Sequence, residues 1–423
     1  MARSGDILVI GAGIGGIKAS QLLSKAGHQV HMVERTAHIG GTSIKFEDVF
    51  PNLECATCML SPLEQELLQD PRIHLLTLTE LEGLEGSPGD LTARLRQKAR
   101  FVNLDNCIGC GACYDACPAS AINEFEEGLS QRKAIYVPCA GALPNVPHID
   151  PEVCIRFKGE ECVACQEACV FEAIEYAQED KALELKAGAV LVAVGSAVMD
   201  AKQLKRFSYG THPGVFTALE LERLNASNGP TEGHIRLRDG REPKRIALVH
   251  CVGRRERTLC SAVCCRYLLK FRHYLRHKLP CAEVCEYHTD LCLPNKGDQH
   301  FLGEMAPGGE GLMRAEVVRV EGEGDSLKVV LSRDGQEFSE TFDMVVLSPA
   351  LIPSDGVAEL AQKLGVELAD DGFLAVKGVA SSRPGVFILG GASGPKDIRE
   401  TVIEAMAAAG EARRTIMAKE DGE

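Results

Sequence analysis

Apolar runs separated by polar turns predict a series of buried strands and helices along the chain. Residues 6–10 form a short apolar run, and residues 17–26 follow with helical spacing up to Gly27. A second apolar run, residues 29–33, ends at the acidic residue Glu34. This order predicts a strand, a helix and a second strand, which is the start of an α/β fold with a parallel sheet.

Three later apolar runs predict further buried strands. They cover residues 188–195, 245–250 and 385–389. An alanine-rich stretch from Asp397 to about residue 418 predicts a long helix near the C-terminus. Strands near 245–250 and 314–332 predict a second, smaller Rossmann-like subdomain, in which residues 291–300 and 307–311 are expected to be loop.

The turn between the first strand and the first helix carries the pattern G-x-G-x-x-G. Gly11 would make the tight turn, Gly13 would let a pyrophosphate approach the backbone, and Gly16 would let the helix pack closely on the strand. The helix N-terminus offers free N–H groups to phosphate, and Glu34 can accept from ribose hydroxyls. Gly15, Arg35 and the pair Gly40-Gly41 belong to the same expected site. The glycine pair resembles that of flavoprotein disulfide reductases, which favours FAD.

Composition and charge exclude several classes of function. The net charge of −14 argues against nucleic-acid binding, and no stretch approaches the about 20 apolar residues of a membrane helix. Residues 1–6 show no secretory signal pattern, so we expect a cytoplasmic protein without direct membrane insertion. Eighteen cysteines in such a protein indicate metal or redox chemistry rather than disulfides.

Two runs of four cysteines predict a two-cluster ferredoxin module. The first run, C-x2-C-x2-C-x3-C-P, ends at Pro118, and the second has a longer first gap and Val170 in place of proline. The fourth cysteine of each run is expected to cross to the other cluster. One 4Fe–4S cluster would then use Cys107, Cys110, Cys113 and Cys169, and the other Cys154, Cys162, Cys165 and Cys117. Zinc is the competing interpretation of paired C-x2-C motifs, but the tight first run favours clusters.

Further cysteines lie outside this module. Where a second glycine turn would hold NAD(P)H in a two-dinucleotide flavoprotein, the chain has four thiols, predicting a third, unusual 4Fe–4S site: Cys251, Cys260, Cys264 and Cys265. The alternative is that some are buried apolar residues.

The remaining thiols leave alternatives open. Cys55 and Cys58 are either a redox dithiol or ligands of the third cluster. Cys281, Cys285 and Cys292 either form another metal site with Cys55 and Cys58 or are inert, and Cys139 is expected to be structural.

The chain resembles the A-subunit family of heterodisulfide reductases, including the A subunit of the quinone-interacting membrane-bound oxidoreductase complex. The resemblance rests on segments spread over nearly the whole chain: Gly11–Gly16, Phe50-Pro51 with Cys55 and Cys58 before residues 60–62, the ferredoxin insertion, Cys251-Val-Gly with Cys260 and Cys264-Cys265, and Gly394 to Ile398. Longer members carry additional cluster domains outside this region. The resemblance implies that the chain binds FAD and that it assembles with the other subunits of such a complex. Within that complex, a homodimer of this chain is one expected assembly. Some members split electron pairs at the flavin.

We therefore expect a thioredoxin reductase-like FAD fold with an inserted ferredoxin. The expected parts are residues 1–100, 181–215 and 340–423 for the FAD domain, 101–180 for the ferredoxin, and 216–339 for the second subdomain. Further FAD-site residues are Gly195, Gly390, Gly391, Lys396, Asp397 and Ile398. At Gly391 the related flavoproteins have an aspartate that binds the ribityl chain. The expected catalytic residues are Cys55, Cys58 and Lys396.

Three functions remain open on the sequence. The first is an FAD and iron–sulfur electron-transfer subunit of a multisubunit oxidoreductase, membrane-associated only through partners. In such a protein the flavin would convert between two-electron and one-electron steps. The second is a self-sufficient flavin disulfide or NAD(P)H oxidoreductase using Cys55 and Cys58. The third is a scaffold with structural clusters, which eight ferredoxin-type ligands disfavour.

Overall fold

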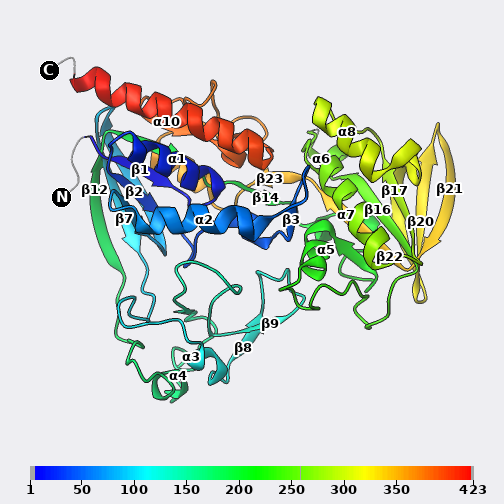
Figure 1. Ribbon diagram of the computed structural model, residues 1–423, viewed down its shortest axis with the longest axis horizontal. Coiled ribbons are helices and arrows are strands. Elements are labelled where there is room, and N and C mark those ends of the chain that lie inside the picture. The colour runs from blue at the N-terminus through cyan, green and yellow to red at the C-terminus, as the bar shows by residue number, and fades with distance from the viewer. Residues whose placement is uncertain (1–4, 258, 421–423) are drawn as a thin grey trace. The chain divides into compact units, whose positions relative to one another are not determined.

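The computed structural model of the chain describes residues 5–257 and 259–420, so the expectation for the N-terminal residues 1–4 lies outside the described part. The chain forms two compact units (Figure 1). The first comprises residues 1–44, 58–196 and 353–423, and the second comprises residues 45–57 and 197–352.

The first unit is built on a five-stranded parallel sheet. Its strand order is β24-β13-β1-β2-β5, formed by Val386–Ile388, Ala189–Val192, Ile7–Ile10, Val30–Val33 and Ile73–Leu76. Strand β13 pairs with β1, and β24 pairs with β13, although long stretches of sequence separate them. The early and late apolar runs therefore complete one sheet, as the sequence predicts.

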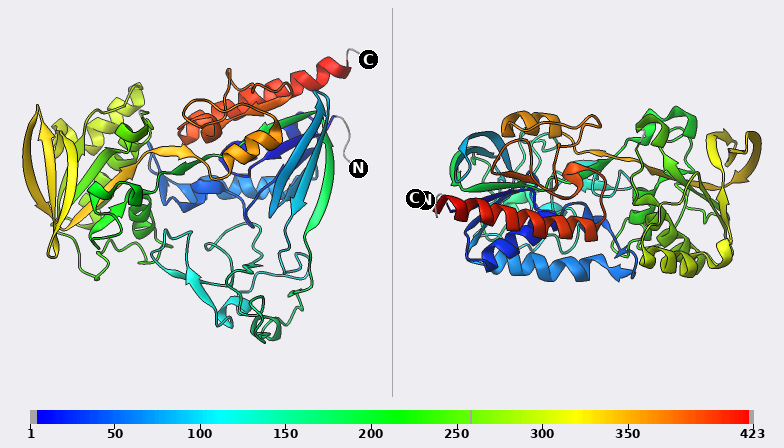
Figure 2. Two further views of the ribbon diagram at one scale, coloured as in Figure 1. Left: turned by 180° about the vertical axis from the view of Figure 1, so that it is seen from behind. Right: turned by 90° about the horizontal axis from the view of Figure 1, so that it is seen from above.

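Both faces of this sheet are buried, because alternate residues of β1 point into different cores. Ile7 and Val9 pack with three helices: α1 (Ile14–Lys25), α2 (Ala56–Gln69) and α10 (Ile398–Glu420). Leu8 and Ile10 pack with an antiparallel sheet of β6 (Thr79–Ser87), β7 (Asp90–Gln97) and β12 (Lys181–Ala187), and with α9 (Val357–Leu364). Figure 2 shows the long helix α10 and the antiparallel strands from two further directions.

The ferredoxin module leaves the antiparallel sheet after β7 and returns to it at β12. Its short elements are α3 (Ala112–Asp115), α4 (Ala164–Glu167), β8 (Ser120–Ile122), β9 (Gln131–Lys133), β10 (Ile135–Tyr136) and β11 (His148–Ile149). An isolated bridge between Val102 and Ile174 closes the module at its base. Six of the eight cysteines belong to or pack on its small core together with Phe101 and Ile135, so the thiols replace much of the side-chain volume that a module of this size would otherwise need.

The second unit carries another five-stranded parallel sheet in the order β15-β22-β16-β17-β18. These strands are Val215–Thr217, Met344–Pro349, Arg245–Val252, Glu283–His288 and Leu312–Arg314. Its helices are α5 (Ala218–Asn225), α6 (Arg254–Arg257), α7 (Cys264–Lys278) and α8 (Lys296–Met305). An antiparallel sheet follows, formed by β19 (Glu316–Glu323), β20 (Ser326–Arg333) and β21 (Gln336–Phe342). Four short strands complete the list: β3 (Asp48–Val49), β4 (Glu54–Cys55), β14 (Ser196–Val198) and β23 (Leu351–Pro353).

One expectation about this unit is wrong. Residues 291–300 are not loop throughout, because α8 begins at Lys296. Asn295 and Asp298 form a reciprocal capping box that satisfies N–H groups at the helix start, and Phe301 and Met305 bury one face of the helix. The proline, glycine and polar residues at 294–297 mark the cap of this helix rather than a continuing loop.

None of the described helices is both long enough and apolar enough to span a membrane.

Candidate functional site

The glycine turn of the first unit has the close packing that a dinucleotide site requires. A side chain at Gly16 would overlap the carbonyl oxygen of Gly11, and one at Gly11 would lie 2.5 Å from the carbonyl oxygen of Ala193. Gly13 forms a bridge with Gly40, and the Gly40 N–H donates to the Ala12 carbonyl at 2.8 Å. No side chain caps α1, so its first N–H groups are available to a phosphate. The residues therefore fit a bound dinucleotide.

The acidic residue after β2 is already engaged with the neighbouring backbone. The Glu34 carboxylate accepts from the N–H of Ala12 at 2.9 Å and from the N–H and hydroxyl of Thr36 at 2.8 and 2.9 Å. Arg35 donates to the carbonyl of Asp355 at 3.0 Å. Glu34 thus fixes the position of the glycine turn relative to the end of β2.

The C-terminal residues expected at the site meet at the start of α10. Asp397 and Glu400 form a capping box, while Lys396 donates to Ser393 at 2.8 Å and pairs with Glu404 at 3.4 Å. Glu404 also accepts from the N–H of Gly390 at 2.8 Å, and Ile398 is the first residue of the helix. A side chain at Gly391 would lie 2.9 Å from the N–H nitrogen of Ser196, beside Gly195. This crowding explains why position 391 is a glycine and has no room for a side chain.

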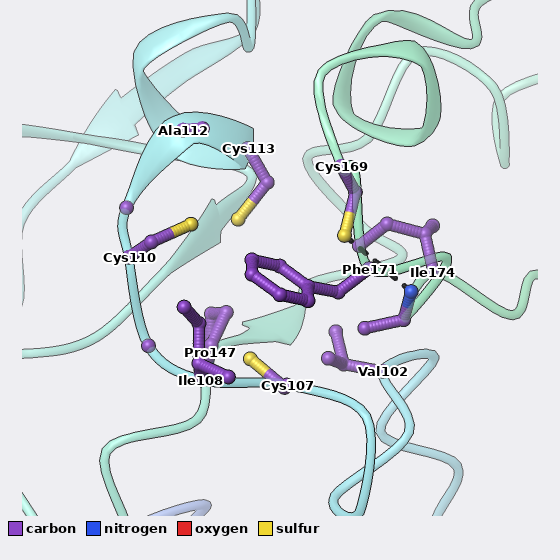
Figure 3. A pocket seen from close by; sticks show the side chains of 13 residues that line it. Val102, Cys107, Ile108, Cys110, Ala112, Cys113, Pro147, Cys169, Phe171 and Ile174 are labelled. Carbon is purple, nitrogen blue, oxygen red and sulfur yellow. Dashed lines mark hydrogen bonds between the residues drawn. The ribbon is translucent and has the colours of Figure 1, made fainter.

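The structure gathers the eight ferredoxin cysteines in two groups of four. Cys107, Cys110, Cys113 and Cys169 border one pocket together with Phe171 and Pro147 (Figure 3). Cys117, Cys154, Cys162 and Cys165 border a second pocket with Ile135 and Tyr176. In both groups three thiols come from one run and the fourth from the other run. This is the crossed arrangement that the spacing of the cysteines predicts.

Two of these sulfur atoms, those of Cys169 and Cys165, already have a hydrogen-bond partner. The Ala173 N–H donates to Cys169 Sγ at 3.4 Å, and Cys165 Sγ lies 3.0 Å from the Tyr176 hydroxyl. Burial raises the pKa of the Cys113 thiol to about 12, so this thiol in the protein alone is neutral at pH 7. Metal binding would have to displace its proton, because thiolates are the form that ligates iron.

The cysteines of the second unit gather between the end of β16 and the start of α7. The ligand atoms of His250, Cys264 and Cys265 lie within 4.8 Å of one another. The thiols of Cys251 and Cys265 both lie 3.9 Å from the Asp290 carbonyl.

Two neighbours lower the pKa of the Cys265 thiol to about 4: first the Cys264 thiol, and then His250. His250 is fully enclosed and lies 2.5 Å from Glu286 through its Nε2 atom. The neighbours of Cys265 therefore favour its thiolate, which is the form that ligates metals.

The structure adds a fifth thiol to this group, Cys292, which the sequence offers only as one of three spare thiols. The N–H of Cys292 donates to Cys265 Sγ at 3.2 Å, and the Cys292 thiol interacts with Cys260. Nothing in the spacing of Cys292 marks it, because it reaches the group through the β17–α8 connection. Cys281 is exposed, and Cys285 lies in β17.

The pair Cys55 and Cys58 is divided between the two units. Cys55 ends β4 in the second unit, and Cys58 lies in the first turn of α2 in the first unit. Both residues are exposed, and neither forms a disulfide. The role of Cys55 and Cys58 stays a prediction.

Two protein-family models match parts of the chain. Residues 9–61 match an NAD(P)-binding Rossmann-like domain, and residues 100–123 match a 4Fe-4S binding domain. The two matches coincide with the glycine turn and with the first cysteine run.

Curated relatives match nearly the whole chain. The A subunit of the H(2):CoB-CoM heterodisulfide,ferredoxin reductase of Methanothermobacter marburgensis is 34% identical over 96% of this chain and 63% of its own length. A protein of Archaeoglobus profundus, named as similar to the A subunit of heterodisulfide reductase, is 35% identical over 97% of this chain and 66% of its own length. The chain thus spans slightly less than two thirds of these relatives.

Solved structures support the fold. Thioredoxin reductase of T. acidophilum aligns with a TM-score of 0.53 at 12% identity, covering 97% of this chain and 98% of that protein. Thioredoxin reductase of Lactococcus lactis gives a TM-score of 0.51 at 13% identity, covering 98% and 99%. The thioredoxin reductase-like fold predicted from the sequence is confirmed, as is the ferredoxin module.

Proposed function

Because the chain belongs, over the part of the family that it spans, to the A-subunit family of heterodisulfide reductases, we propose that it is an FAD and iron–sulfur electron-transfer subunit of a multisubunit oxidoreductase. The observation that carries this proposal is that two pockets with four cysteines each lie in the same compact unit as the glycine turn. A flavin exchanges electrons in pairs and a 4Fe–4S cluster singly, so this combination serves conversion between the two.

Different residues of the chain would hold the FAD and the two 4Fe–4S clusters. The N-terminus of α1 and the glycines of the turn would bind the pyrophosphate of FAD through backbone N–H groups. The two crossed sets of thiolates would each hold one 4Fe–4S cluster. The start of α10 would offer the positive end of its helix dipole to an electron-rich flavin edge, with Lys396 held beside it by Ser393 and Glu404.

We extend the proposal to a third cluster in the second unit. Cys251, Cys260, Cys264 and Cys265 supply four thiols, and the lowered pKa of Cys265 provides a thiolate. The N–H of Cys292 would stabilise charge on that sulfur. The partners would be the other subunits of a heterodisulfide reductase-like complex, since the relatives are named as subunits of such enzymes.

Metal and flavin analysis of anaerobically purified protein tests this function. We expect about twelve iron atoms and about twelve labile sulfides for each FAD, because three clusters hold four irons each. The variant Cys260→Ser should lower iron to about eight. The control variant Cys281→Ser removes an exposed thiol and should leave the iron content unchanged.

Two outcomes would contradict parts of the proposal. About eight iron atoms in the wild-type protein would limit it to the ferredoxin clusters, and would favour a flavin disulfide oxidoreductase using Cys55 and Cys58. Absence of flavin or of ferredoxin iron after anaerobic reconstitution would overturn the electron-transfer function itself.

A further inference from the structure

Arg100 is a buried arginine whose hydrogen-bond partners are all uncharged. In the sequence Arg100 comes immediately before the expected ferredoxin module, residues 101–180, and it is only 6% exposed. One nitrogen donates to the carbonyls of Val146 at 2.8 Å and Pro147 at 3.4 Å. The other donates to the Ala37 carbonyl and the Thr77 hydroxyl, both at 2.7 Å. Both terminal nitrogens of the guanidinium are thus hydrogen-bonded, but none of these partners neutralises its charge.

No carboxylate compensates this charge within the described residues. Burial lowers the pKa of Arg100 to about 10, so the side chain stays positive at neutral pH, and Cys107 alone acts to raise it. Arg132, within the ferredoxin module, shows the usual pairing of a buried arginine with carboxylates, because it pairs with Glu124 at 2.6 Å and Asp150 at 2.8 Å. Buried charges in proteins are normally paired in this way, so an unpaired one indicates an anionic group nearby.

The two titratable histidines that interact with Arg100, His38 and His148, supply no negative charge. His38 and His148 are in ring contact, with centroids 6.0 Å apart. Burial is the main cause that lowers the pKa of His38 to about 3 and that of His148 to about 4. His148 and Arg100 lower the pKa of His38 further, and Arg100 lowers that of His148, so both rings are neutral. Asp150, the acidic residue that influences His148, is already held by Arg132.

The position of Arg100 identifies the anion. Its partner Pro147 borders the pocket of the first cysteine group, and Cys107 of that group raises the pKa of Arg100 against the effect of burial. A 4Fe–4S cluster with four thiolate ligands is anionic, and reduction adds one more negative charge. A fixed positive charge in a low-dielectric interior therefore favours the reduced cluster.

We propose that Arg100 is the built-in counter-charge of the cluster held by Cys107, Cys110, Cys113 and Cys169, and that it raises the reduction potential of this cluster. The inference rests on the proposed function, because it requires that this cluster is present. Arg100 acts through space as a positioning and tuning residue. The cluster gains one electron without any bond or proton change at Arg100. Its other contacts, to Ala37 and Thr77, hold the charge between the module and the segment that leads to Gly40.

Reduction of the purified protein with dithionite, followed by EPR at a series of potentials, tests the proposal. Arg100→Met and Arg100→Gln should each lower the potential of one ferredoxin cluster by at least a tenfold change in the reduced-to-oxidised ratio, about 59 mV. Arg100→Lys keeps the charge and should stay close to wild type. The shift should persist at high salt, because a buried charge is poorly screened.

Arg96→Gln is the matched control. Arg96 lies on β7 a few residues earlier and pairs with Asp180 at 2.6 Å, but it is 55% exposed, so its removal should leave the potential unchanged. Wild-type potential in Arg100→Gln with the ferredoxin irons present would overturn the proposal, as would a Lys variant that shifts as far as Gln. Should the Met variant lose iron, the Gln variant decides, since its amide can still donate to the carbonyls. Lack of ferredoxin iron in the wild type would instead refute the proposed function.

Discussion

Single residues decide whether the first unit can bind the proposed dinucleotide, and Gly16 is the clearest case. A methyl group at this position would overlap the Gly11 carbonyl oxygen, so Gly16→Ala must push α1 away from the turn that receives the pyrophosphate. We expect purified Gly16→Ala to contain less than about a tenth of the wild-type flavin, with ferredoxin iron retained. Flavin absorbance and iron content of the same sample measure this.

Gly410→Ala is the control for this substitution. Gly410 lies within α10 in the same unit, and nothing occupies the space that its side chain would fill. The variant should keep its flavin and gain a little helix stability, because alanine favours helix over glycine. Equal flavin content in Gly16→Ala and Gly410→Ala would show that the turn does not hold the cofactor.

Residue spacing predicts part of the candidate site and misses the rest for physical reasons. The crossed cysteine groups follow from the runs alone, because the ferredoxin pattern fixes which thiols are close along the chain. Cys292 and Arg100 carry no such pattern. Their importance comes from contacts with Cys265 and with carbonyls near His148, which only the folded chain brings together.

At the scale of elements, a buried ion pair fastens α7 to α5 in the second unit. Lys270 Nζ lies 2.5 Å from the Glu222 carboxylate, both side chains are 1% exposed or less, and Lys270 also donates to the Asp48 carbonyl at 3.0 Å. Lys270→Met would leave the Glu222 charge buried without its cation. We expect this to cost roughly 3–5 kcal/mol, measured as a lower denaturant midpoint and faster hydrogen exchange in α5 and α7.

The double variant Lys270→Met, Glu222→Leu should recover part of that loss, because no charge is then left buried. Arg319→Met removes exposed pairs with Glu321 and Glu337 in the same unit and should leave the midpoint unchanged. Exchange rates in Lys270→Met equal to those of Arg319→Met would contradict the structural role of the pair.

Elements with strong apolar periodicity are predictable, whereas those defined by tertiary contacts are not. The strands near 189, 245 and 386 and the helix α10 follow from apolar runs. The segment 45–57 belongs to the second unit through Lys270 and through Glu222, which accepts from the Glu47 N–H at 2.9 Å. Its sequence does not distinguish it from the residues of the first unit on either side.

At the scale of the whole molecule, each of the two units has its own five-stranded parallel sheet. The units differ at the turn that follows the central strand, β1 in the first unit and β16 in the second. In the first unit this turn is the glycine sequence before α1. In the second unit β16 ends at Val252, and Gly253 leads directly into the single turn α6. Cysteines replace the glycines that would let a pyrophosphate approach. The fold is therefore that of a thioredoxin reductase, whereas the second unit carries thiols where a glycine turn would follow β16.

The missing glycine turn in the second unit predicts that NADH and NADPH are not the electron donors of this protein. NADH and NADPH at millimolar concentration should not bleach the flavin of the anaerobic protein, because the described residues that follow β16 lack a glycine-rich phosphate cradle. Dithionite should bleach it, since small reductants need no binding site. Both reactions can be followed by flavin absorbance in one cuvette, with an authentic NADPH-dependent flavoprotein as positive control. Rapid bleaching by either nicotinamide would mean that the second unit binds the nucleotide by another surface. The chain would then be a self-sufficient oxidoreductase rather than one component of a complex that receives its electrons from partners.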